Sequence, residues 1–180
     1  MEKELAALIR SMNTLQLRAY ELFTQSFNNQ DKPEQLLMTI SGEAGTGKSY
    51  ITQAIRLFTK IKFGKTNSAI GPILVVAPTG SAAYNVNGYT WQSVLNKSKQ
   101  DKGSVLKKIS QHVSNQLQGK LDGLQVVIID EMSLINLESL VDINRRLQAA
   151  QRDKTRQQML FGGCTVILMG DFYQVRKNSS

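Results

Sequence analysis

The chain has 180 residues, 41% of them hydrophobic and 20% charged, which is enough to bury the core of one domain without covalent staples. One cysteine and one histidine exclude an internal disulfide and argue against a structural zinc site. The formal net charge of +8 suits a polyanionic partner such as nucleic acid but does not identify one. No apolar run approaches the ~18 residues of a membrane helix, and the first residues lack a signal-peptide core. We therefore expect an intracellular protein with no membrane partner, nuclear if its source is eukaryotic.

Two helices are predicted before the first strand. Residues 1–10 have apolar side chains at spacings that permit a short helix. A second helix is predicted after Asn13, a favourable N-cap, because its apolar residues recur on one face. These residues are Leu15, Ala19, Leu22, Phe23 and Phe27. Pro33, at the end of a polar loop, closes this helical lead-in.

A glycine-rich loop lies between a predicted strand and a predicted helix. The apolar run 36–41 is interpreted as a buried strand, and residues 42–49 fit the P-loop pattern G-x-x-x-x-G-K-[ST] without a mismatch. Helical spacing follows at Ile51, Ala54, Ile55 and Phe58, so a chance match to the pattern is the weaker interpretation. Backbone N–H groups of such a loop bind phosphate, assisted by the helix N-terminus. The expected nucleotide-binding residues are Gly42, Glu43, Ala44, Gly45, Thr46, Gly47, Lys48 and Ser49.

Three further apolar runs without polar alternation predict strands that are buried on both faces, as in a parallel sheet covered by helices. They are residues 73–77, 126–129 and 166–169. Helices are expected after Thr79, after Thr90, over residues 104–118 and from about Asn136. This alternation predicts an α/β doubly wound domain, in which ligands bind at the carboxyl ends of the strands. We see no repeat or linker that would divide the chain.

Chemically informative side chains follow two of these strands. Asp130 and Glu131 come directly after residues 126–129, as in a Walker B element, where the first carboxylate holds Mg²⁺. The second carboxylate can orient and deprotonate the attacking water. A pair of solvated acids at a strand end is the alternative interpretation. Gln174 follows the last strand, and its amide can both donate and accept, which suits the sensing of a γ-phosphate.

Six sequence blocks together resemble the first motor domain of the Pif-type DNA helicases, in the RecD-like branch of superfamily one. In order they are LQ-x-x-AY (15–20), the P-loop (42–49), APTG-x-AA (77–83), IIDEMS (128–133), FGG (161–163) and GDFYQ (170–174). The P-loop and the acidic pair fit many NTPases, whereas the third block and the last two are more specific. The resemblance implies a RecA-like P-loop NTPase domain that uses ATP and Mg²⁺. Residues 1–180 would form this single domain, with residues 1–33 as a helical lead-in.

The resemblance also implies roles by matching position. Gln16 would bind the adenine edge, which we favour over the alternative that Gln16 simply reaches back to an Asn13 cap. Lys48 would contact the β- and γ-phosphates. The implied catalytic residues are Lys48, Glu131 and Gln174, and the implied Mg²⁺ ligands are Ser49 and Asp130.

Single-stranded DNA would lie along two short segments by the same resemblance. The implied contacts are Thr79, Gly80, Ala82, Thr90, Trp91, Gln92 and Ser93. The rings of Tyr84, Tyr89 and Trp91 could stack on bases, or could simply pack within the protein. The family usually has His where Gln92 stands, and Leu-Pro-Pro-Val where this chain continues from Val175.

The expected function is that of an ATP-dependent DNA helicase acting on single-stranded DNA or a forked duplex. The second motor domain and its arginine finger are absent from these residues, so we expect Mg·ATP binding with little turnover and no unwinding by the chain alone. One alternative is another P-loop NTPase, such as a helicase loader or a small-molecule kinase. Another is a degenerate module that binds nucleic acid without catalysis.

Overall fold

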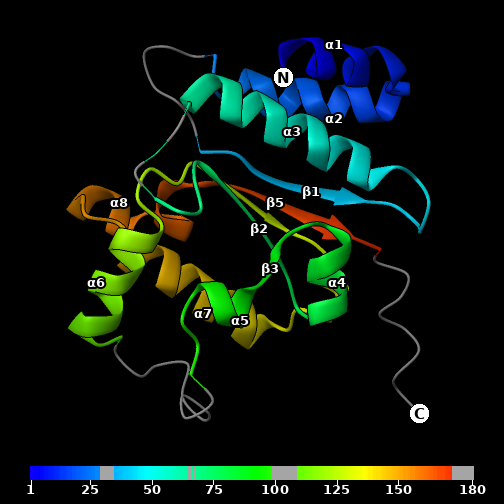
Figure 1. Cartoon of the computed structure of the whole chain (residues 1–180). Helices are drawn as coiled ribbons and strands as arrows, with labels where there is room; N and C mark the ends of the chain where they lie inside the picture. Colours follow the sequence, from blue (N-terminus) through cyan, green and yellow to red (C-terminus); the bar gives the residue numbers. More distant parts are fainter. Residues whose placement is uncertain (29–34, 65, 67, 99–108, 172–180) are drawn as a thin grey trace, which may run out of the picture.

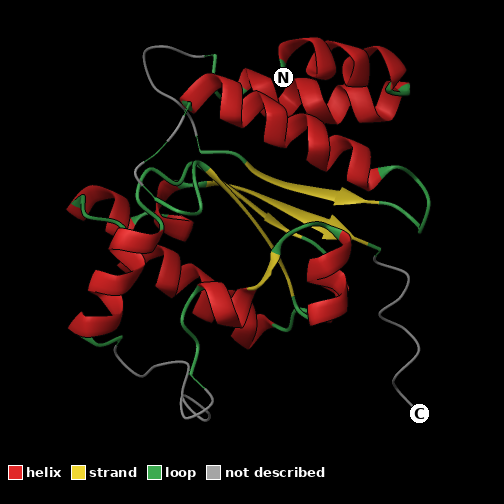
Figure 2. Cartoon of the chain, in the orientation of Figure 1, coloured by secondary structure: helices red, strands yellow, loops and turns green. Residues whose placement is uncertain are grey.

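The protein is built on a parallel β-sheet with helices on both faces (Figures 1 and 2). The computed structural model describes residues 1–28, 35–64, 66, 68–98 and 109–171. The strands are β1 (Leu37–Ser41), β2 (Ile73–Ala77), β3 (Tyr89–Thr90), β4 (Val126–Ile129) and β5 (Thr165–Gly170). Their order in the sheet is β1-β5-β4-β2-β3, and every pair is parallel. The expected RecA-like α/β architecture is confirmed.

One face of the sheet is covered by three helices. They are α1 (Glu2–Ser11), α2 (Thr14–Gln25) and α3 (Lys48–Phe63), drawn above the sheet in Figure 1. Phe23 of α2 is fully buried, and its ring packs edge-on against Phe58 of α3 with 5.4 Å between ring centroids. Ile73 and Val75 of β2 face this layer, since alternate residues of a strand point to opposite sides.

The opposite face packs against a second helical layer. It contains α5 (Trp91–Val94), α6 (Gln111–Lys120) and α7 (Leu137–Ala149). Leu74 and Val76 of β2 join Ile143 and Leu147 of α7 in its core. The remaining elements are α4 (Gly80–Asn85), η2 (Met132–Leu134), α8 (Lys154–Gln158) and η3 (Leu160–Gly163).

All four predicted strands are present, and the differences from the prediction lie at the two edges of the sheet. The interpretation of the first strand as buried is wrong, because β1 is an edge strand of the described sheet and Leu37 is 48% exposed. The sequence analysis also missed β3, which pairs with β2 through Val76–Tyr89 and Ala77–Thr90. A strand of two residues is too short to show any periodicity, so only its neighbour in the sheet defines it.

The helix starts follow the capping residues. Asn13 and Thr79 cap α2 and α4 as predicted, accepting from Gln16 N at 2.9 Å and from Ala82 N at 3.2 Å. Thr90 precedes α5, but its hydroxyl donates to the Ser93 hydroxyl at 2.8 Å rather than capping a backbone N–H.

The predicted helix over residues 104–118 begins later than expected. Residues 104–108 lie outside the described residues. Ser110 is the N-cap of α6 and accepts from Val113 N at 3.3 Å, so Ile109 stands before the helix rather than within it. A serine that can bond the backbone three residues ahead favours starting the helix there.

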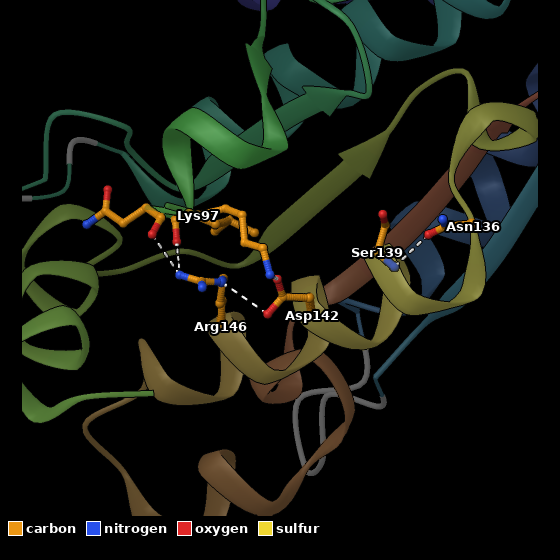
Figure 3. Close-up of polar contacts among 7 residues, drawn as sticks. Lys97, Asn136, Ser139, Asp142 and Arg146 are labelled. Atoms are coloured by element: carbon orange, nitrogen blue, oxygen red, sulfur yellow. Dashed lines mark hydrogen bonds and ion pairs between the residues drawn. The ribbon is translucent and has the colours of Figure 1, made fainter. Parts of the chain in front are cut away.

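A buried ionic cluster ties α5 to α7 (Figure 3). Arg146 Nε lies 3.2 Å from Asp142 Oδ1, and Lys97 Nζ lies 2.6 Å from Asp142 Oδ2. Arg146 also donates through Nη1 to the carbonyls of Leu95 and Asn96 at 2.9 and 2.8 Å. The guanidinium thus satisfies carbonyls at the end of α5, while the Asp142 carboxylate balances its charge.

Candidate nucleotide-binding site

The P-loop joins β1 to the first turn of α3 at the carboxyl edge of the sheet. Gly45 and Gly47 have φ values of +80° and +84°, which only glycine adopts readily. Gly47 is the N-cap of α3. The Gly42 N–H donates to the Gly170 carbonyl at 3.0 Å, so the start of the loop is fixed to the end of β5.

Lys48 lies across the loop that precedes it. Its Nζ donates to the carbonyls of Gly42 and Glu43 at 2.5 and 2.8 Å. The ammonium group is therefore held against the loop, where a phosphate bound by the backbone N–H groups would be within its reach. Ser49 is exposed on the first turn of α3.

Gln16 combines helix capping with a contact to the P-loop. Its Oε1 accepts from Asn13 N at 3.0 Å, which closes the capping box, so the capping interpretation is confirmed. Its Nε2 donates to the Thr46 carbonyl at 3.0 Å. A side chain on Gly47 would collide with the Gln16 amide. These contacts place Gln16 beside the loop, and its role toward adenine stays a prediction.

Asp130 and Glu131 follow β4 at the same edge of the sheet. Asp130 N donates to the Val76 carbonyl at 2.8 Å, which extends the pairing of β4 with β2. Glu131 adopts φ 50° and ψ 46°, a left-handed conformation that is unfavourable for any residue with a Cβ. Both side chains are half-buried, and among the described residues neither carboxylate forms a hydrogen bond or an ion pair. They are free to take a ligand.

The strand order decides how these parts are arranged. β5 lies between β1 and β4, with Ser41 paired to Gly170 and Ile129 paired to Leu168. The P-loop and the acidic pair therefore flank the end of β5. Asp171 continues from β5 and is half-buried, and Gln174 lies outside the described residues.

The donors at this edge fit Mg²⁺ in a nucleotide complex. The Ser49 hydroxyl and the Asp130 carboxylate are hard oxygen ligands, which Mg²⁺ prefers together with phosphate oxygens and water. Within the described ranges, no group of three or more His, Cys, Asp or Glu residues could hold a metal.

The segments expected to contact DNA extend from the same edge, after β2 and β3. Thr79, Gly80 and Ser93 are exposed, whereas Ala82 is buried. Of the two interpretations of Trp91, packing within the protein is confirmed and base stacking is excluded, because Trp91 is only 5% exposed and packs in the core beneath the sheet. An indole buries more apolar area than any other side chain, so its burial in the core stabilises the fold.

Two exposed rings lie in the same region, Tyr84 on α4 and Tyr89 on β3, with exposures of 86% and 48%. Arg56, which the sequence analysis missed, holds the turn between them: it donates to the carbonyls of Val86 and Asn87 at 2.7 and 2.9 Å. Burial lowers the pKa of its guanidinium. Arg56 belongs to α3, so the P-loop helix and the α4–β3 turn are joined directly. In the sequence, only the position of Arg56 on the less apolar side of α3 could have indicated that it contacts the α4–β3 turn.

The PIF1-like helicase family model matches residues 11–177. The chain belongs to this family. Its sequence is 31% identical over 137 residues to ATP-dependent DNA helicase PIF1 of Saccharomyces cerevisiae, covering 75% of this chain and 15% of that protein. The chain thus spans under one fifth of this PIF1 relative's length.

Solved PIF1 structures share the fold. Pif1 helicase from Candida albicans aligns with a TM-score of 0.64 and 24% identity, covering 90% of this chain and 33% of that one. Pif1 helicase from Bacteroides in complex with ADP-AlF3 and ssDNA aligns with a TM-score of 0.55 and 26% identity, covering 89% of this chain and 32% of that one. Across the described part of this PIF1-like chain, no helix is long and apolar enough to cross a membrane.

Proposed function

We propose that this chain is the ATP-binding part of an ATP-dependent DNA helicase that acts on single-stranded DNA or a forked duplex. The observation that carries the proposal is the meeting of the P-loop and the Asp130–Glu131 pair on either side of the end of β5. Family membership argues against the helicase-loader and small-molecule-kinase alternatives. The relatives named above support the choice of nucleotide and of DNA.

Each residue of the site has a distinct task in this proposal. The P-loop N–H groups and Lys48 bind the phosphates, and Gln16 lies where it can bind the base. Ser49 and Asp130 would hold Mg²⁺, which when bound neutralises charge on the phosphates. Glu131, whose carboxylate is free among the described residues, accepts the proton of the attacking water. Gln174 would respond to the γ-phosphate.

DNA unwinding belongs to the longer protein in this proposal. The chain spans about a third of the solved PIF1 chains. The proposal assigns unwinding to two motor domains acting together. The 180 residues are expected to bind Mg·ATP with little turnover. An arginine finger raises the rate of phosphoryl transfer by about 10³–10⁵ in related NTPases, and the proposal assigns this contribution to a second motor domain.

The test is a titration with a fluorescent ATP analogue in the presence of Mg²⁺. Lys48→Ala should weaken binding by about tenfold or more, because a charged hydrogen bond to phosphate is lost. Lys60→Ala is the matched control, since Lys60 is an exposed lysine near the other end of α3. It should bind like the parent chain. Equal affinities of Lys48→Ala and the parent chain would overturn the nucleotide-site assignment.

A further inference from the structure

Gly170 lies at the end of β5, between the P-loop and the Asp130–Glu131 pair. It is the last residue of β5, it is buried, and it pairs with Ser41 at the end of β1. Its carbonyl accepts the Gly42 N–H at 3.0 Å, so it holds the first residue of the P-loop. The other side of Gly170 faces the turn that follows Glu131.

That turn leaves no room for a side chain at position 170. A Cβ built on Gly170 would lie 2.9 Å from Met132 Cγ and 3.0 Å from Met132 N, and 3.6 Å from Ser133 N. Gly170 is not among the described glycines with positive φ, so its backbone conformation is open to other residues. A side chain here would therefore require Met132 to shift, because η2 packs directly onto the end of β5.

The packed turn carries the proposed catalytic carboxylate. Glu131 is held in its left-handed conformation immediately before Met132, and its carbonyl accepts the Leu134 N–H at 3.0 Å within the turn. A non-glycine residue keeps this conformation only where the surrounding structure enforces it. The close contact of Met132 with Gly170 is such a constraint. Pushing the turn outward would move Glu131 and its neighbour Asp130 together.

We propose that Gly170 is a positioning residue of the nucleotide site. By lacking a side chain it lets the Asp130–Glu131 turn close against β5, while its carbonyl fixes the P-loop on the other side. Gly170 thereby sets the spacing between the phosphate-binding loop and the carboxylates. This inference rests on the proposed function, since the spacing matters only where a Mg²⁺–nucleotide complex bridges the two parts.

The experiment compares Gly170→Ala and Gly170→Val with the parent chain by titration with a fluorescent ATP analogue, with Mg²⁺ and with EDTA. A misplacement of several tenths of an ångström should weaken Mg²⁺-supported binding by roughly three- to tenfold, and more for valine. Binding in EDTA, which does not need the Mg²⁺-holding carboxylate, should stay within about twofold. Gly119→Ala is the control, because a Cβ on this α6 glycine meets nothing within 4 Å.

Adding Met132→Ala to Gly170→Ala tests whether the steric contact causes the loss of affinity. A loss caused by general instability would not be rescued in this way. In the double variant with Gly170→Ala, the side-chain part of the contact is removed and the part with Met132 N remains. Mg²⁺-supported affinity should recover in part relative to Gly170→Ala. If Gly170→Ala does not fold, the Mg²⁺-supported affinity of the double variant is compared with that of Met132→Ala alone. Thermal unfolding of each variant accompanies the titrations.

The outcomes separate this inference from the proposed function. Gly170→Ala and Gly170→Val with the parent's Mg²⁺-supported affinity would overturn the positioning role and leave the nucleotide site standing. Equal losses with Mg²⁺ and with EDTA would also overturn it, because the P-loop itself would then be damaged. A parent chain that binds no nucleotide under either condition would overturn the proposed function and, with it, this inference.

Discussion

Gln16 donates its side-chain amide to the Thr46 carbonyl at 3.0 Å, which links the start of α2 to the P-loop. The same side chain completes the capping box with Asn13. Helix start and loop position are therefore coupled through one residue. Capping and the contact with the loop are compatible, because they use different atoms of the amide: Oε1 for the cap and Nε2 for the Thr46 carbonyl.

The contributions of Asn13 and Gln16 to stability and to nucleotide binding can be separated by substitution. Asn13→Ala removes the cap acceptor and should lower the free energy of unfolding by about 1 kcal/mol while leaving nucleotide affinity near that of the parent. Gln16→Ala removes the loop contact as well, so we expect a similar loss of stability together with weaker binding of an adenine nucleotide. Urea unfolding and fluorescent-nucleotide titration measure the two effects. Unchanged affinity in Gln16→Ala would contradict the role of Gln16 in binding.

The Asp142 carboxylate is predicted to dominate the buried ionic cluster. Asp142→Ala removes the carboxylate that pairs with Lys97 and with Arg146, whose side chain is 5% exposed. Breaking a buried pair in this way costs about 3–5 kcal/mol in unfolding free energy. Asp122→Ala is the matched control, because its pair with Arg152 is 4.0 Å long with exposures of 46% and 69%. The control should change stability by less than about 0.5 kcal/mol. Similar values for the two variants in urea unfolding would refute the prediction.

Tyr84 is predicted to stack on a DNA base. Its side chain is 86% exposed, so Tyr84→Ala should leave stability unchanged while weakening binding of a labelled single-stranded oligonucleotide by about fivefold or more. Leu160→Ala is the control, since Leu160 is also exposed and precedes β5, at the amino edge of the sheet. Fluorescence anisotropy at fixed low salt measures both. Equal oligonucleotide affinity in Tyr84→Ala and the control would remove Tyr84 from the proposed DNA path.

Cys164 is predicted to make stability fall in alkaline solution. Burial raises the pKa of its thiol from 9.0 to about 11, so the folded state keeps a proton that the unfolded state releases. The stability from this group is fully present below pH 9.0 and is lost as pH rises toward about 11. Burial also raises the pKa of Tyr20, which adds a decline of the same sign above pH 10.0. Urea unfolding should therefore show a shallower decline between pH 9 and 11 for Cys164→Ala than for the parent.

Local sequence was sufficient to predict several elements. The runs 73–77 and 126–129 are apolar throughout, which is the pattern of a parallel strand covered on both faces. Asn13 and Thr79 form bonds to backbone three residues away, so their capping depends little on the rest of the chain. The exposure of Leu37 and the burial of Trp91 depend on which elements cover them, and no local pattern reports that.

From the residues alone, the P-loop could be placed between a strand and a helix, and Asp130–Glu131 at the end of another strand. Both follow from short-range rules that link residue type to backbone conformation. The contacts of Gln16 with Thr46 and of Gly170 with Gly42 and Met132 depend on tertiary structure. They arise because β5, the last described strand, inserts between β1 and β4. Strand order is set by how the two helical layers pack on the whole sheet, so segments far apart in sequence become neighbours only in the folded chain.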